Sequence, residues 1–213
     1  MDTFADTRIY GGKSMAVRRA ERRAKFIEAG LTVFGGKGYA ASSVADICAE
    51  AGLARSQFYS EFGSREDLLL GVYDAVQDDS QTAVVAALER EGADAEKALL
   101  TAAAMAALVR SVGDDPRRAR IVFVEMIGVS SRVEKHRANR RALWAEFIAA
   151  TIAERSDGGF TPPGGYKLAT TAFLGALTEL VHAWSTSDPR PPIDDLIAVI
   201  TAVLNALVRQ PAE

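Results

Sequence analysis

The sequence has 213 residues, of which 48% are hydrophobic and 25% are charged. This length and balance allow one or two compact domains with a sizeable core, and they exclude a chain that is disordered as a whole. The net charge of −3 is unevenly divided, because residues 8–65 carry ten Lys and Arg against five Asp and Glu, which leaves −8 on the rest. We therefore expect an anionic partner for the N-terminal third only.

The single cysteine, Cys48, has no second thiol with which to form an internal disulfide or a metal cage. Residues 1–14 lack the apolar run of a secretory signal. No stretch of about 18 apolar residues is present, so we expect no membrane partner and a cytoplasmic location. The composition also calls for no cofactor.

Helical periodicity runs along almost the whole chain, and no segment has the strict alternation of a half-buried strand. The sequence therefore predicts an all-α protein of about nine helices after a flexible arm at residues 1–14. The helices are expected near residues 15–34, 43–50, 54–61, 64–90, 95–111, 116–127, 132–155, 166–185 and 193–208. The clearest loops are expected at 156–165 and 186–192, and the first helix is expected to stop at Gly35, Gly36 and Gly38 because glycine favours the left-handed C-cap.

Two of the short helices, within Ser43 to Phe62, have the dimensions of a helix-turn-helix. Ser43 is suited to cap the first helix, and Gly52 can adopt the positive φ that the turn requires. Cys48 offers a small side chain where the two helices cross. Apolar anchors for the preceding helix are expected at Val44, Ile47, Leu53, Phe58 and Phe62. The outward face of the second helix is then polar, as a helix entering the major groove must be.

The segment from Gly38 to Leu69, GYAASSVADICAEAGLARSQFYSEFGSREDLL, closely resembles the DNA-binding segment of TetR-family transcriptional regulators. The matching elements are Gly38-Tyr39, Ser43, Val44 to Cys48, Ala51-Gly52-Leu53, Arg55, Tyr59 to Phe62 and Ser64 to Leu68. The resemblance implies a DNA-binding domain at 15–63 and an effector-binding and dimerisation domain at 64–213. It also implies a double-stranded DNA partner with a palindromic operator.

The resemblance further implies roles for single residues. The residues expected to contact DNA are Ser43, Arg55, Ser56, Gln57, Tyr59, Ser60 and Arg65. Ser43, Arg55, Tyr59 and Arg65 would contact phosphates, Arg65 together with the N-terminus of its helix. The glutamine and the two other serines would read bases, since glutamine can pair bidentately with adenine. Arginines in the first helix, Arg18, Arg19 and Arg22, would add non-specific attraction.

Glu61 departs from the family pattern, in which a histidine or an aromatic residue is more usual. An acidic side chain there would repel phosphate or accept a hydrogen bond from a cytosine amino group. Gln57 and Ser56 also replace the commoner threonine and glycine. These departures concern the operator sequence and leave the expected binding mode unchanged.

The two C-terminal helices favour a homodimer. Small residues form a stripe on helix 166–185, and apolar residues cover more than one face of helix 193–208. A terminal helix that is apolar on two faces usually needs a second partner. An effector pocket is expected among the large apolar side chains of the body, namely Met105, Phe123, Met126, Trp144, Phe147 and Phe173, although any one of them taken singly is more often ordinary core.

Other functions are weaker interpretations. The segment Phe34 to Gly38 lacks the spacing of a phosphate-binding loop, and His136 and His182 have no nucleophile that would complete a catalytic set, so no catalytic residues and no enzyme are expected. Glu179 and His182 form a single Glu-x-x-His pair, which is too little for a metal site. A dimeric adaptor that has lost DNA binding, or a helical hairpin used only for packing, remains an alternative. The favoured reading is a transcriptional repressor that an unknown small apolar effector releases from its operator.

Overall fold

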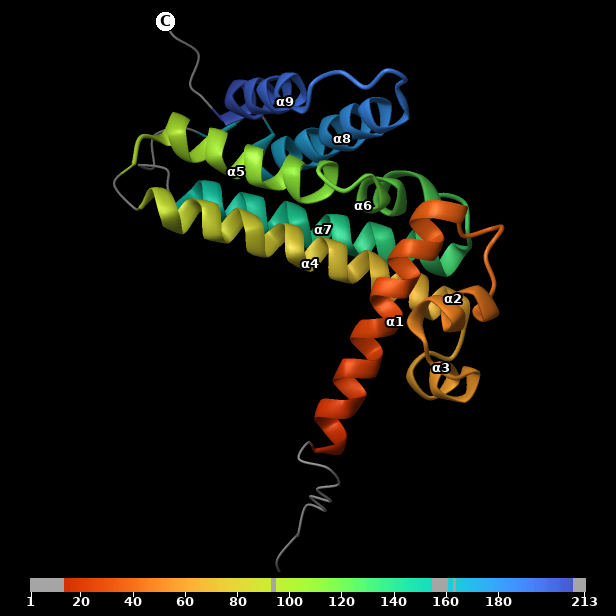
Figure 1. Cartoon of the computed structure of the whole chain (residues 1–213). Coiled ribbons are helices and arrows are strands. Elements are labelled where there is room, and N and C mark those ends of the chain that lie inside the picture. The colour runs from red at the N-terminus through yellow and green to blue at the C-terminus, as the bar shows by residue number, and fades with distance from the viewer. Residues whose placement is uncertain (1–13, 93–94, 155–160, 163, 209–213) are drawn as a thin grey trace, which may run out of the picture. The chain divides into compact units, whose positions relative to one another are not determined.

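The computed structural model describes residues 14–92, 95–154, 161–162 and 164–208 (Figure 1). Within these residues every regular element is helical, which confirms the predicted all-α class. The α-helices are α1 (Met15–Lys37), α2 (Val44–Ala51), α3 (Arg55–Glu61), α4 (Arg65–Glu91), α5 (Lys97–Gly113), α6 (Pro116–Arg120), α7 (Ser131–Glu154), α8 (Gly165–Thr186) and α9 (Ile193–Val208). A π-helical turn, η1 (Ile121–Glu125), follows α6. No helix in the described part of the chain is long and apolar enough to cross a membrane.

The predicted arm at 1–14 lies outside the described residues except for Ser14, which caps α1 by accepting a hydrogen bond from the Val17 amide at 3.3 Å. Most of the loop predicted at 156–165 lies outside them as well. The chain divides into two compact units, residues 1–72 and 73–213, and α4 contributes to both. The functional division between 63 and 64 stays a prediction.

The first unit is held together by an aromatic core. Phe26 of α1 meets Phe58 of α3 edge to face, with ring centroids 5.4 Å apart, and Phe62 lies 6.3 Å from it in the same geometry. All three side chains are buried, as is Ile47 of α2. One aromatic cluster thus fixes two short helices on α1, as the sequence predicted for these anchors.

Helix α1 also packs closely on the first turns of α4, and Gly30 makes this approach possible. A Cβ at Gly30 would lie 2.8 Å from Val72 and 3.1 Å from Leu68. The end of α1 differs from the prediction, because the helix continues through Gly35 and Gly36 to Lys37. Gly38 follows with φ 91° and ψ 151°, which is not the left-handed cap that was expected.

The second unit is a helical body. Helix α5 packs against α9, and α8 packs against α7 and α9. Polar contacts tie α7 to α4: His136 Nε2 lies 2.7 Å from Asp74 Oδ1, Arg140 Nη2 lies 2.5 Å from Asp78 Oδ1, and Trp144 Nε1 donates to Gln77 Oε1 at 2.7 Å. Polar contacts therefore join helices that lie far apart in the sequence.

The helix expected near 116–127 begins as predicted but does not continue as an α-helix. Asp115 caps it by accepting a hydrogen bond from the Arg117 amide at 2.9 Å, and Pro116 occupies the first position. From Ile121 to Glu125 the helix widens into the π form. Such single turns often lie at functional sites, and a hydrophobic pattern with a period of 3.6 residues does not reveal them.

Candidate nucleic-acid interface and effector pocket

Ser43 fixes the start of α2 through a reciprocal cap. Its Oγ accepts a hydrogen bond from the Asp46 amide at 3.1 Å, and the Asp46 carboxylate accepts from the Ser43 amide at 2.7 Å. Hydrogen bonds from Ser43 and then Lys37, whose Nζ lies 3.0 Å away, lower the pKa of Asp46 from 3.8 to about 2. The predicted N-cap is confirmed, and its acidic partner at the third position completes a capping box.

The turn between α2 and α3 depends on Gly52, which has φ 62° and ψ 32°. This is the left-handed region, where a residue with a Cβ is strained. Cys48 lies half-buried one turn before it, and burial raises the pKa of its thiol. A protonated, half-buried thiol fits a packing role rather than a reactive one.

Helix α3 presents a polar face to solvent while Phe58 on its other side is wholly buried. The exposed residues of the helix are Arg55, Ser56, Tyr59 and Ser60. Arg55 Nη2 donates to the Tyr59 hydroxyl at 3.3 Å, and the Arg55 guanidinium lies 5.6 Å from the Tyr59 ring centroid. The structure thus brings four of the seven predicted DNA-contacting residues together on one accessible face.

Gln57 is placed differently from these four residues. Its side chain is half-buried, and its Oε1 accepts a hydrogen bond from the Ala54 amide at 2.9 Å. Ser60 in turn donates to the Gln57 carbonyl oxygen at 2.7 Å. Gln57 therefore caps the start of α3, a role that its third position in the helix would have suggested.

Arg65 lies half-buried at the start of α4. Its guanidinium is stacked 4.3 Å above the Tyr39 ring and donates a hydrogen bond to the Ser42 carbonyl oxygen. These contacts join α4 to the loop before α2. Arg65 thereby helps to position the loop that leads to Ser43. Its predicted contact with a DNA phosphate stays a prediction.

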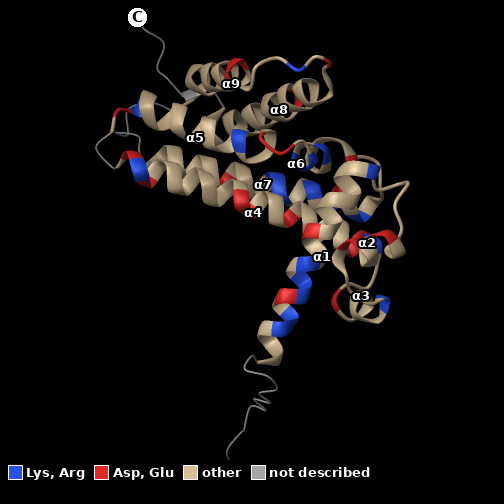
Figure 2. Cartoon of the chain, in the orientation of Figure 1, with Lys and Arg blue, Asp and Glu red and all other residues tan. Residues whose placement is uncertain are grey.

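Glu61 does not face solvent, since its side chain is only 1% exposed. It accepts hydrogen bonds from Arg19 Nε at 3.1 Å and from Arg22 Nη2 at 3.1 Å. Arg23 donates to the Glu61 carbonyl oxygen at 3.2 Å and stacks 4.4 Å above the Phe62 ring. Glu61 thus holds the end of α3 against the N-terminal half of α1 through these hydrogen bonds. The basic residues of that half of α1 are blue in Figure 2.

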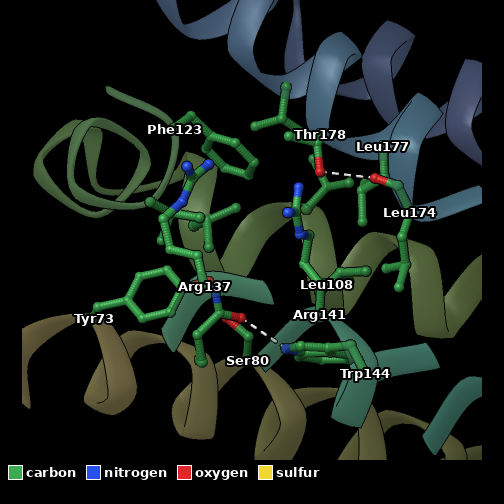
Figure 3. Close-up of a pocket in the computed structure, with 15 residues that line it drawn as sticks. Tyr73, Ser80, Leu108, Phe123, Arg137, Arg141, Trp144, Leu174, Leu177 and Thr178 are labelled. Atoms are coloured by element: carbon green, nitrogen blue, oxygen red, sulfur yellow. Dashed lines mark hydrogen bonds between the residues drawn. The ribbon is translucent and has the colours of Figure 1, made fainter. Parts of the chain in front are cut away.

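A pocket lies within the second unit (Figure 3). It has a cavity volume of about 70 Å³ and is lined by Tyr73, Gln77, Ser80, Leu108, Val109, Val112, Val122, Phe123, Arg137, Arg141, Trp144, Leu174, Leu177, Thr178 and Val181. Of the six predicted pocket residues it contains Phe123 and Trp144. Met105, Met126 and Phe173 are buried elsewhere in the body, and Phe147 packs edge to face on Trp144 at 5.6 Å without lining the pocket.

Sequence reasoning missed the charged part of this pocket. The sequence predicts a helix at 132–155 but assigns no role to Arg137 or Arg141. Arg137, Arg141 and Trp144 follow one another at intervals of four and three residues, which places all three side chains on one face of α7. That shared face was the signal that could have identified them.

No group of three or more His, Cys, Asp or Glu side chains within the described residues could hold a metal ion. His182 instead lies with Nδ1 3.0 Å from the Phe123 carbonyl oxygen, in the π-helical turn. This histidine therefore has a structural partner on the wall of the pocket.

The two short helices α2 and α3, joined by a turn at Gly52, have the form of a helix-turn-helix. Residues 26–72 match the model of the bacterial regulatory proteins of the tetR family. Residues 26–72 are thus a DNA-binding domain of the tetR type.

Solved structures share the fold over nearly their whole length. FadR from Bacillus subtilis, in complex with stearoyl-CoA, is 20% identical, with a TM-score of 0.69 over 87% of this chain and 97% of its own. A regulatory protein of the tetR family from Rhodococcus RHA1 is 21% identical, with a TM-score of 0.67 over 88% and 97%. The multidrug binding protein EbrR, complexed with imidazole, is 22% identical, with a TM-score of 0.64 over 90% and 97%. No curated protein sequence matches the chain.

Proposed function

We propose that this chain is a homodimeric repressor that binds a palindromic operator through α3 and is released from it by a small, largely apolar effector. The observation that carries the proposal is the helix-turn-helix itself: α3 is fixed from behind by Phe58 and Glu61 and presents a polar face to solvent. This is how a recognition helix must be held if it is to enter a major groove.

On this proposal the exposed pair of Arg55 and Tyr59 contacts the phosphate backbone, with Ser43 and Arg65 at its edges. Ser56 and Ser60 lie on the same exposed face and are placed to read bases. Gln57 reads adenine only after releasing the Ala54 amide, so its contribution to sequence preference has a cost of about one hydrogen bond, roughly 1 kcal/mol.

The proposal of a homodimer rests on the outer faces of α8 and α9. Leu168 is 60% exposed on α8, and Val199 is 48% exposed on α9. The same two helices also expose small residues, which are Ala172, Gly175 and Ala183 on α8 and Ala198, Ala202 and Ala206 on α9. Exposed apolar and small residues on both helices favour close packing against a second copy, which would place two recognition helices about 34 Å apart.

The proposal of an effector rests on the pocket in the body. The ligands in the two neighbouring complexes, stearoyl-CoA and imidazole, differ widely in size and charge. The fold therefore supports binding of a small molecule without specifying which. Binding that favours one spacing of the two recognition helices would shift the dimer away from its operator-bound form.

The experiment that tests DNA recognition is selection from random duplex DNA with the full chain at about 100 mM salt, because electrostatic affinity depends steeply on salt. We expect a palindrome with half-sites about one helical turn apart. Tyr59→Ala should weaken binding to that site at least about tenfold while the dimer stays intact, and Gln57→Ala should relax the preferred sequence more than it weakens binding. Absence of any enriched sequence from a folded dimer would contradict the proposal.

The alternative of an adaptor without DNA binding depended on an acidic residue on the DNA-facing side of α3. Glu61 is buried against Arg19 and Arg22 instead. The ion pairs with these arginines explain why an acidic residue occupies this position, so Glu61 no longer favours the adaptor. Failure of the selection experiment is the result that would revive it.

A further inference from the structure

The pocket has a mostly apolar wall and, on one side, two positively charged side chains. Apolar side chains from α5, η1 and α8 form most of it, among them Leu108, Phe123 and Leu177. Helix α7 contributes two arginines one turn apart, Arg137 and Arg141. Figure 3 shows both extending from α7 in the same direction, Arg137 beside Phe123 and Arg141 toward Thr178.

No acidic side chain is found among the described residues that line this pocket. Arg137, whose side chain is 12% exposed, is held by Glu134 from outside the lining at 2.9 Å. Arg141 is exposed, and among the described residues its charge attracts Glu134 without forming a hydrogen bond or ion pair with it. The pocket therefore carries positive charge that the lining itself does not neutralise.

Most of the remaining polar groups of the lining already have partners within the chain. Trp144 donates to Gln77, Ser80 donates to the Val76 carbonyl oxygen at 2.8 Å, and Thr178 donates to the Leu174 carbonyl oxygen at 2.7 Å. Donor capacity for a ligand thus resides mainly in the arginines. An uncharged apolar ligand would displace water from Arg141 without replacing it, which is costly, whereas an anion would form charge-assisted hydrogen bonds.

We infer that the effector is an anionic amphiphile, with a carboxylate or phosphate head group at Arg141 and Arg137 and an apolar chain directed toward Leu108, Phe123 and Leu177. This inference rests on the proposed function, of which it specifies the ligand class. A cationic or purely apolar ligand does not fit a lining with this charge.

The cavity is too small to enclose an apolar chain in its present form. Its volume of about 70 Å³ is well below the roughly 300 Å³ or more of sites that enclose a drug-sized ligand. An apolar chain must therefore widen the pocket as it enters. The π-helical turn with Val122 and Phe123 forms one wall, and such turns often lie at functional sites.

The test measures binding of dodecanoate and dodecanol to the full-length protein by calorimetry at neutral pH, together with release of the selected operator. Dodecanoate should bind at least about tenfold more tightly than dodecanol. Arg141→Gln should lower this ratio several-fold by weakening the binding of dodecanoate, and it should not weaken the binding of dodecanol. Lys135→Gln, which removes one exposed charge from the same helix outside the pocket, should preserve it. Dodecyl phosphate, measured in parallel, distinguishes a phosphate from a carboxylate as the preferred head group.

The outcomes separate this inference from the proposed function. Equal binding of acid and alcohol, or a ratio that Arg141→Gln does not change, overturns the anionic head group, and release of the operator by dodecanol would then still support an apolar effector. Binding of dodecanoate that depends on Arg141 without operator release supports the site and contradicts effector-controlled release. No binding of either compound overturns the inference, while the result of operator selection still stands on its own.

Discussion

The two units of the chain achieve order by different means. In the N-terminal unit α2 has 8 residues and α3 has 7, lengths at which an isolated helix is marginal in water. These helices depend on caps at Ser43 and Gln57 and on one aromatic cluster. In the body, helices of 16–24 residues, from α9 to α7, pack over long apolar faces. The comparison suggests that single side chains control the first unit, whereas the body can absorb a change in shape around its pocket.

The largest expected effect would come from removing the centre of the aromatic cluster. Phe58→Ala should cost about 3–5 kcal/mol, because Phe58 is fully buried between Phe26 and Phe62. Both tryptophans of the chain lie in residues 73–213, so tryptophan emission reports only on the body. We expect circular dichroism to show an early loss of helix in denaturant while the emission transition stays in place.

Phe173→Ala is the matched control, because Phe173 is equally buried but lies in α8. It should move the tryptophan transition instead. If Phe58→Ala moved both transitions together, the two units would unfold as one and the comparison would fail.

The second prediction concerns the clamp between α1 and α3. Glu61→Gln should destabilise the N-terminal unit by about 1–3 kcal/mol, since charge-assisted hydrogen bonds from Arg19 and Arg22 are weakened. The lower end is expected, because the Arg19 side chain is 67% exposed and solvent screens its share. Denaturant unfolding followed by circular dichroism measures the loss.

The same variant should keep the operator sequence that the parent protein selects. Glu50→Gln, at an exposed position of α2, is the control and should change neither property. A changed preference at unchanged stability would mean that Glu61 reads a base and does not act as a clamp.

The sequence predicted more of the N-terminal unit than of the body for a physical reason. Caps, a turn glycine and an aromatic spacing act within a few residues, so Ser43, Gly52 and Phe58 were placed correctly from local pattern alone. The burial of Glu61 was not predictable in this way, because its partners Arg19 and Arg22 lie about forty residues earlier in the chain.

In the body, the order and approximate ends of the helices followed from periodicity, but the pocket did not. The lining of a cavity depends on how α4, α5, α7 and α8 pack against one another. That packing cannot be predicted from the pattern of residues within any one helix. Phe123 and Trp144 were identified among six candidates, while Arg137 and Arg141 were missed because a charged helix face usually faces solvent.

The third prediction compares two glycines of the N-terminal unit. A Cβ would meet no atom within 4 Å at either Gly52 or Gly36, so sterics between side chains cannot distinguish them. Gly52→Ala should destabilise by about 1–2 kcal/mol because φ is 62° there. Gly36→Ala, within α1, should stabilise by about 0.5–1 kcal/mol. Equal effects of the two substitutions on the free energy of unfolding would show that backbone conformation does not control this unit.

The smallest expected effect is a dependence on pH at the capping box. Because the folded pKa of Asp46 is lowered from 3.8 to about 2, its carboxylate stabilises the fold fully above pH 4 and loses that contribution as the pH falls toward 2. The difference in unfolding midpoint between the parent protein and Asp46→Asn should therefore be constant near neutral pH and shrink between pH 4 and pH 2. Asp78→Asn, which removes a carboxylate of the body paired with Arg140, reports on the other unit. A difference for Asp46→Asn that persisted at pH 2 would mean that the charge of this carboxylate does not hold the start of α2, and that the cap acts through the Ser43 hydroxyl alone.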